Sequence, residues 1–319
     1  MNRVAAFFTR VFEYAVPDPY IYAVGLTLLS AALAFAFAPH RTPADVLGSW
    51  YAGIFAILAF ALQMILILVT GYALAASAPV QANLRRIAAW PKTPKNAVTL
   101  TFLVSAIACW LNWGFGLVVA GLLAREIAKR MRIDFGWLVA AAYSGFLIWA
   151  SGLSSSIALA QATPGSKLNI VQGLTGHVLS LGSTIFTAFN LVPVIVLLAI
   201  VPFVLRALEP RDVVVAGNTP AIVNSSLGPA LGQASDPEER AAGPHHEETS
   251  LASVLENAWI LNAIVAIAGL GYIGWNWHTA GVSLDINSVI FIFFCAGLLL
   301  HWRPIAYVAA VNDAARITG

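Results

Sequence analysis

The sequence predicts an all-α polytopic membrane protein. Apolar residues make up 59% of the chain and charged residues only 10%, whereas soluble domains are about one quarter charged. The apolar residues gather in long runs separated by polar and basic segments. A run of about 20 apolar residues is long enough to cross a bilayer as a helix. The runs predict about six transmembrane helices and one re-entrant hairpin.

The first elements follow from the N-terminal runs. Segment 1–19 mixes phenylalanines with two arginines, which is typical of an amphipathic segment on the inner membrane surface, although a frayed terminus is the alternative. The run 20–38 is longer than the apolar region of a typical signal peptide, so we expect it to remain as the first span. The complete set of apolar runs is 20–38, 51–76, 98–124, 137–162, 184–205, 257–275 and 288–300.

The run 98–124 is uncharged and has basic clusters on both sides. The clusters are Arg85, Arg86, Lys92 and Lys95 before it, and Arg125, Lys129, Arg130 and Arg132 after it. Basic loops stay on the cytoplasmic side, so both ends of the run should face that side. Two full spans would need roughly 40 apolar residues, more than the run contains. We therefore expect a re-entrant hairpin over 98–124.

The charge distribution then sets the orientation of the chain. With the N-terminus inside and the hairpin returning to its own side, all but two of the 17 Lys and Arg lie on the cytoplasmic side; the exceptions are Arg41 and Lys167. This pattern predicts a multi-pass protein with a cytoplasmic N-terminus. Segment 206–256 is rich in proline and glycine and ends acidic, which predicts a flexible cytoplasmic linker.

The centre of the hairpin is the first candidate for a substrate-binding site, at Asn112, Trp113, Gly114, Phe115 and Gly116. Non-helical backbone at membrane depth is tolerated only where it is buried in protein or lines a cavity. Glycine allows the turn and brings backbone N–H groups close to a ligand. The Asn112 amide can donate and accept, while the aromatic rings could form apolar walls. The alternative is a turn with packing value only.

The run 137–162 contains the second candidate, at Ser151, Gly152, Ser154, Ser155 and Ser156. Hydroxyls and a glycine in mid-run predict a broken helix over 137–162. Transporters use the positive N-terminus of such a half-helix to hold carboxylates. Serines bonding back to their own helix, or small-residue helix packing, are the alternatives.

A third, weaker set lies in the run 51–76. Gln63, Thr70 and the following Ser77 are spaced by seven residues, so they face roughly one side of a helix. That face could line the cavity. Ordinary hydrogen bonding between helices is the favoured alternative.

Several classes of chemistry are excluded by what the runs lack. None of the 15 Asp and Glu, and no Lys, Arg or His, lies inside an apolar run, so a solute must be held by dipoles, backbone groups and neutral side chains. Cys109 and Cys295 have no metal-ligand spacing, and no further ligand accompanies His245 and His246. We therefore predict no metal, no cofactor and no nucleic-acid partner. The spans contain no nucleophile–base pair and the chain no G-x-S-x-G motif, so no enzyme activity is expected.

Sequence motifs along nearly the whole chain resemble the short-chain fatty acid transporter family, which includes bacterial acetoacetate and butyrate permeases. The string Asn112–Val119 carries the resemblance most specifically. The further motifs are Pro17-Asp18-Pro19, Gln63-Met64, Val69-Thr70-Gly71, Ser77-Ala78-Pro79-Val80, Ala124-Arg125-Glu126, Ala162-Thr163-Pro164-Gly165 and Ala296-Gly297-Leu298-Leu299-Leu300-His301.

The resemblance implies a secondary transporter of short monocarboxylates in the inner membrane. Because no acidic residue lies inside an apolar run, we expect coupling to H⁺ carried by the protonated acid, or to a cation such as Na⁺ held by backbone carbonyls. It also implies inverted repeats, each with a re-entrant hairpin and a broken helix. Residues 112–116 would then form one tip of the substrate site and residues 151–156 the broken-helix region. The oligomeric state stays open between a monomer and a homo-oligomer.

Two departures from the family pattern accompany the resemblance. Family members have more glycine around positions 150–155, where this chain has Ala150, Leu153 and Ser155. They also continue beyond the equivalent of Gly319 with a second hairpin. We therefore expect a first membrane repeat over 20–205 and, over 257–319, a linker span with the start of an incomplete second repeat. A truncated, non-transporting remnant or a membrane partner of the same family is the alternative function.

Overall fold

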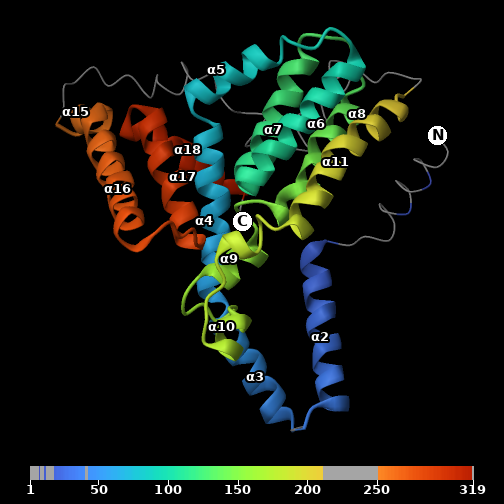
Figure 1. Cartoon of the computed structure of the whole chain (residues 1–319), viewed down its shortest axis with the longest axis vertical. Coiled ribbons are helices and arrows are strands. Elements are labelled where there is room, and N and C mark those ends of the chain that lie inside the picture. The colour runs from blue at the N-terminus through green and yellow to red at the C-terminus, as the bar shows by residue number, and fades with distance from the viewer. Residues whose placement is uncertain (1–6, 8–10, 12–17, 40–41, 211–250, 318–319) are drawn as a thin grey trace. The chain divides into compact units, whose positions relative to one another are not determined.

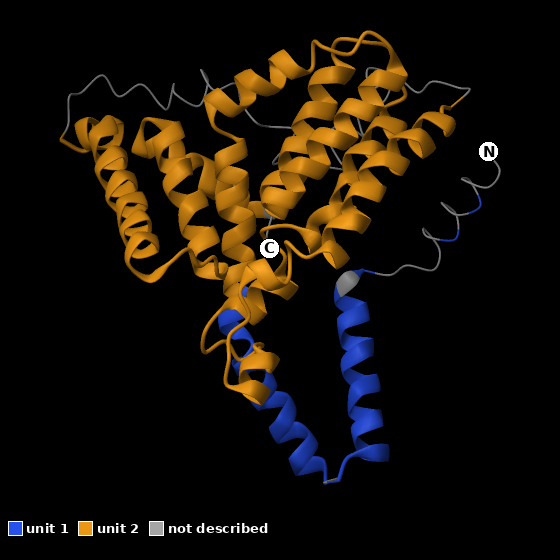
Figure 2. Cartoon of the chain, viewed as in Figure 1, with its two compact units in different colours: residues 1–61 blue, residues 62–319 orange. Residues whose placement is uncertain are grey.

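The computed structural model describes residues 7, 11, 18–39, 42–210 and 251–317. These residues form helices and no strands, and the chain divides into two compact units, 1–61 and 62–319 (Figure 2). The predicted all-α polytopic class is confirmed, because six helical segments in the described part are long and apolar enough to cross a membrane. They are Tyr20–Phe37, Pro43–Ala75, Pro94–Leu111, Phe135–Ala162, Ala188–Ala207 and Trp259–Ala280.

The structure and the sequence prediction agree on six spanning segments, but the six segments are not the same ones. The first arm of the expected hairpin is long enough to count as a candidate span. The run 288–300, in contrast, lies in the shorter helix α17 (Ile286–His301). Apolar length alone therefore does not separate a crossing helix from a hairpin arm.

The first unit contains α2 (Pro19–Phe37) and α3 (Pro43–Ala56). The Asp18 carboxylate caps α2 by accepting from the Tyr20 N–H at 2.8 Å. The Thr42 hydroxyl caps α3 by accepting from the Asp45 N–H at 3.2 Å, so this helix begins well before the predicted run 51–76. The predicted amphipathic segment 1–19 lies almost entirely outside the described residues.

Helix α4 (Leu58–Ala75) leads into the core of the second unit, with buried residues from Ile67 onward. A short helix that the sequence analysis missed follows it, α5 (Ala78–Ile87), with Pro79 in its first turn and Leu84 buried. Its last turn carries Arg85 and Arg86, both exposed. The pattern is amphipathic, because one face packs on the core while the basic residues face outward.

Helices α6 (Pro94–Leu111) and α7 (Trp113–Ala128) form a helical hairpin joined at Asn112 (Figure 1). The hairpin extends beyond the uncharged run 98–124 at both ends, because Lys95 and Arg125 lie inside the helices. At 1.5 Å per residue, α6 is about 27 Å long, close to the roughly 30 Å of a bilayer core. The tip can therefore reach far into the membrane while both ends of the hairpin stay together.

The segment predicted as a broken helix consists of four parts. Helix α8 (Phe135–Ser144) runs directly into the 3₁₀ helix η1 (Gly145–Ser151). Non-helical residues 152–155 follow, and α9 (Ser156–Ala162) resumes the helix. The sequence analysis expected the interruption at 151–156 but not the 3₁₀ helix before it.

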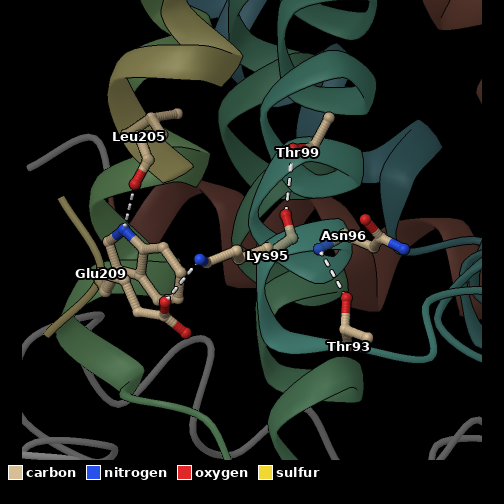
Figure 3. A network of polar contacts seen from close by, with 7 residues as sticks. Thr93, Lys95, Asn96, Thr99, Leu205 and Glu209 are labelled. Atoms are coloured by element: carbon tan, nitrogen blue, oxygen red, sulfur yellow. Dashed lines mark hydrogen bonds and ion pairs between the residues drawn. The ribbon is translucent and has the colours of Figure 1, made fainter. Parts of the chain in front are cut away.

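Helix α6 lies at the centre of the second unit and packs on α7, α8, η1 and α11 (Ala188–Ala207). Short helices α10 (Ile170–Thr175) and η2 (Leu181–Ser183) precede α11. Polar contacts fix the C-terminal end of α11 (Figure 3). The Trp137 indole Nε1 donates to the Leu205 carbonyl at 2.9 Å, and the Lys95 ammonium pairs with the Glu209 carboxylate at 3.0 Å.

The C-terminal helices are α15 (Leu251–Asn257), α16 (Trp259–Ala280), α17 and α18 (Pro304–Ile317). Helices α16 and α17 pack side by side (Figure 1). The side chain of His301 in α17 contacts the Ala73 carbonyl of α4 at 2.6 Å. Of the predicted linker 206–256, α11 occupies the beginning and α15 the end, and residues 211–250 lie outside the described part.

Candidate functional site

Asn112 ends α6 and begins α7, so it forms the tip of the hairpin. Its N–H donates to the Ala108 carbonyl at 2.9 Å, and its own carbonyl accepts from the Gly116 N–H at 2.8 Å. Its side-chain Oδ1 accepts from the Phe115 N–H at 2.9 Å and caps α7. The residue is 0% exposed. Because Oδ1 is used as the acceptor, Nδ2 is the donor that is left over.

Two buried side-chain nitrogens in the described part of the chain have no hydrogen-bond partner: Nδ2 of Asn112 and Nε1 of Trp113. Buried polar groups in folded proteins are nearly always paired. An unpaired buried donor costs about 1–3 kcal/mol. Asn112 and Trp113 are adjacent, so both unpaired donors lie at the tip of the hairpin.

Three backbone N–H groups at the start of α7 are used inside the protein. The Trp113 N–H donates to the Ser154 hydroxyl at 2.8 Å. The N–H groups of Phe115 and Gly116 are bonded to Asn112. These three N–H groups are therefore occupied, whereas backbone N–H groups were predicted to meet a ligand.

The glycines of the tip pack against neighbouring backbone. A Cβ on Gly114 would lie 2.7 Å from the Leu68 Cα of α4, and a Cβ on Gly116 would lie 2.4 Å from the Cys109 nitrogen of α6. A Cβ on Gly71 would lie 2.4 Å from the Phe115 nitrogen. These distances support the packing alternative for the glycines, since a side chain has no room at any of the three positions.

The second candidate segment is attached directly to the tip. The Leu153 N–H donates to the Trp110 carbonyl at 2.6 Å, and a Cβ on Gly152 would lie 2.3 Å from that same oxygen. The buried Ser154 hydroxyl holds the Trp113 N–H. The structure therefore brings the two segments together that the sequence analysis selected separately.

The other serines of this segment have local roles. The Ser155 hydroxyl accepts from the Ala158 N–H at 3.4 Å and caps α9, which begins at Ser156. The Ser151 carbonyl accepts from the Asn190 side chain of α11 at 3.0 Å. These contacts fix the break within the bundle.

Gln63 and Thr70 make no hydrogen bond to the tip within the described residues. The Gln63 side chain donates to the Asn287 side chain of α17 at 2.9 Å. This is a hydrogen bond between two helices, the alternative role considered for this set. The Thr70 hydroxyl donates to the Leu66 carbonyl of its own helix at 2.7 Å, and the Ser77 hydroxyl donates to the Leu74 carbonyl at 2.7 Å.

An aromatic cluster that the sequence analysis missed lies beside the tip. The Trp113 indole packs edge-on against Phe146 of η1, with ring centroids 6.5 Å apart. Phe146 stacks in turn on Trp149 at 5.5 Å and on Tyr143 at 5.9 Å. The spacing of three residues between Phe146 and Trp149 was the available signal, because residues i and i+3 eclipse in a 3₁₀ helix.

The electrostatics of the tip come from helix ends. The N-terminus of α7 carries partial positive charge and the C-terminus of α6 partial negative charge, and both meet at Asn112. Within the described part of the chain, the hydrogen bonds of residues 112–116 involve no charged side chain. Such a site can bind a small anion together with a cation, or a neutral acid.

The long apolar helices define a multi-pass helical membrane protein, and the described part contains a buried polar hairpin tip. The model of the family described as short chain fatty acid transporter matches residues 1–319, and the chain belongs to that family. Two relatives, from Escherichia coli and Haemophilus influenzae, both carry the name "Putative short-chain fatty acid transporter".

The similarity to these relatives runs along the whole chain. The Escherichia coli protein is 37% identical over 321 residues, and the match covers 100% of this chain and 69% of the relative. The Haemophilus influenzae protein is 33% identical over 327 residues, with the same two coverages. No solved structure matches the chain.

Proposed function

We propose that the protein carries short monocarboxylates, of the acetoacetate and butyrate class, across the inner membrane, with the carboxylate bound at the tip of the α6–α7 hairpin. The observation that carries the proposal is the pair of unpartnered buried donors, Asn112 Nδ2 and Trp113 Nε1. A carboxylate accepts several hydrogen bonds through its two oxygens, and the positive end of α7 favours its charge.

The same geometry supports transport of the carboxylate together with a cation or proton that balances its charge. A carboxylate held without a positively charged side chain is expensive to bury. The C-terminal carbonyls of α6, at the opposite pole of the tip, provide partial negative charge for a cation. A bound Na⁺, or a proton on the substrate itself, would balance the carboxylate. Transport is therefore cation- or proton-coupled.

The orientation belongs to the same proposal. The N-terminus is cytoplasmic and the α6–α7 hairpin enters the membrane and leaves it on the cytoplasmic face. The basic residues at both ends of the hairpin support this, since Lys92 precedes α6 and Arg130 follows α7, both exposed. Positive charge of this kind is retained on the inner face. The repeat boundaries 20–205 and 257–319 are retained as proposals as well.

Uptake of radiolabelled butyrate into right-side-out membrane vesicles tests the proposal. Trp113→Phe removes the indole N–H while keeping an aromatic ring against Phe146. We expect uptake to fall by about tenfold or more, because a hydrogen bond to a charged group contributes about 1.5–3 kcal/mol.

Trp90→Phe is the matched control, because Trp90 is 67% exposed and the same substitution there should leave uptake unchanged. Uptake should also collapse when the proton and sodium gradients are both dissipated. Native rates in Trp113→Phe would remove the indole from the site, and an absence of any monocarboxylate uptake by the native protein would contradict the proposed activity.

A further inference from the structure

Packed neighbours surround the tip of the hairpin on several sides. Helix α4 closes one side, since the backbone at Gly71 is in contact with the Phe115 nitrogen and the Asn112 side chain. The α6 backbone at Cys109 closes another side, against Gly116.

Two further approaches to the tip are also occupied. The Ser154 hydroxyl is bonded to the Trp113 N–H. On the side of α17, the Phe293 ring packs on Phe115 with centroids 5.9 Å apart. The Trp113 indole itself packs edge-on against the Phe146 ring.

Phe146 is stacked between two further aromatic side chains. It is the central member of the row Tyr143, Phe146 and Trp149, with interplanar angles of 29° and 17° to its two neighbours. Phe146 and Trp149 are three residues apart in η1, which brings them onto one side of a 3₁₀ helix, and Tyr143 joins the row from the end of α8. Glycines at both ends fix η1 on α6: a Cβ on Gly145 would lie 2.2 Å from the Ser105 hydroxyl, and one on Gly152 would meet Trp110.

The geometry points to Phe146 as the residue that limits the length of the acyl chain, so that the carrier accepts short monocarboxylates and excludes medium-chain ones. This inference rests on the proposed function, because it takes the carboxylate to be bound at Asn112 and Trp113. A tail leaving that carboxylate runs along the indole and ends against the Phe146 ring. Stacking on Tyr143 and Trp149 opposes a swing of the Phe146 ring away from the indole.

Initial uptake rates of acetate, butyrate, hexanoate and octanoate, each measured alone in proteoliposomes, test the inference. In the native protein we expect butyrate to exceed hexanoate and octanoate. Phe146→Ala opens the end of the site, so the ratio of hexanoate to butyrate uptake should rise about tenfold or more, since one methylene in an apolar pocket changes discrimination by about 10–200-fold.

Leu147→Ala is the matched control: Leu147 is the next residue of η1 and is 60% exposed, so the ratio should stay at the native value. Phe146→Leu keeps an apolar side chain in the row and should raise the ratio in the same direction by a smaller factor. An unchanged ratio in folded Phe146→Ala or Phe146→Leu protein, judged by a monodisperse elution profile, overturns the inference.

A competition experiment on the native protein requires no variant. Unlabelled octanoate, below its critical micelle concentration, should inhibit butyrate uptake at least tenfold less effectively than unlabelled butyrate. Equal inhibition overturns the chain-length limit even if both Phe146 variants fail to fold. An absence of any butyrate uptake contradicts the proposed function. Butyrate uptake without chain-length discrimination contradicts the role of Phe146 alone.

Discussion

Replacing Gly116 by alanine tests how closely the two arms of the hairpin pack. The new Cβ would lie 2.4 Å from the nitrogen and Sγ of Cys109 and 2.5 Å from its Cα. Two of these three atoms belong to the α6 backbone, so a rotamer change cannot relieve the clash, and the arms must separate. Overpacking of this kind costs about 1–3 kcal/mol.

Gly121 supplies a control in the same helix. A Cβ on Gly121 has nothing within 4 Å, so alanine there should be neutral or should stabilise α7 by up to about 1 kcal/mol. We therefore expect Gly116→Ala to be less stable than Gly121→Ala by about 1–4 kcal/mol.

The assay is unfolding of the purified protein in detergent, followed by far-ultraviolet circular dichroism, together with butyrate uptake in vesicles. Gly116→Ala should unfold at a lower temperature and lose uptake, because moving α7 displaces Asn112. Gly121→Ala should match the native protein in both measurements. Equal stability of the two variants would show that the hairpin is not packed as tightly as these distances require.

The remaining predictions separate capping, packing and ligand contact. Asn112→Ser retains a capping side chain for α7 but removes the amide donor, so uptake should fall at least tenfold while the free energy of unfolding stays within about 1 kcal/mol of native. Asn112→Ala removes the cap as well, so uptake should be lost and the free energy of unfolding should fall by about 1 kcal/mol more. Native uptake in both variants would exclude the amide from the site. Ser154→Ala removes the acceptor of the buried Trp113 N–H, so the free energy of unfolding should fall by about 1–3 kcal/mol in detergent denaturation, and an unchanged value would mean that water replaces the hydroxyl. Lys95→Ala breaks an ion pair whose side chains are 47% and 42% exposed, so the loss should stay below about 1 kcal/mol; a larger loss would show that the Glu209 contact matters to how α11 packs.

Composition was sufficient to predict the fold class, because spans of this length and apolarity have few alternatives in a bilayer. Helix boundaries were harder to predict. Helix α3 begins at Pro43 under a Thr42 cap, a signal present in the sequence but hidden by a search for apolar runs. Helix α5 was missed for the same reason, since its basic last turn lowers its mean hydropathy.

The composition of the candidate site depended on tertiary packing. Asn112 was selected from the sequence, but the close approach of α4 to its side chain, at Gly71, depends on tertiary packing. The same close approaches explain the glycines of the tip, which a local interpretation assigned to ligand access. Phe146 was not selected at all, because its contact with Trp113 requires both the hairpin and the 3₁₀ helix to be in place.

Accessibility of the two ends of the hairpin tests the central claim most directly. Lys92→Cys and Arg130→Cys place single thiols at exposed positions on either side of α6 and α7, in a chain whose buried Cys109 and Cys295 have been replaced by alanine. A membrane-impermeant thiol reagent is then applied to right-side-out and to inverted inner-membrane vesicles. Both thiols should react in inverted vesicles and be protected in right-side-out ones. Labelling of positions 92 and 130 from opposite faces would contradict a hairpin that returns to its own side.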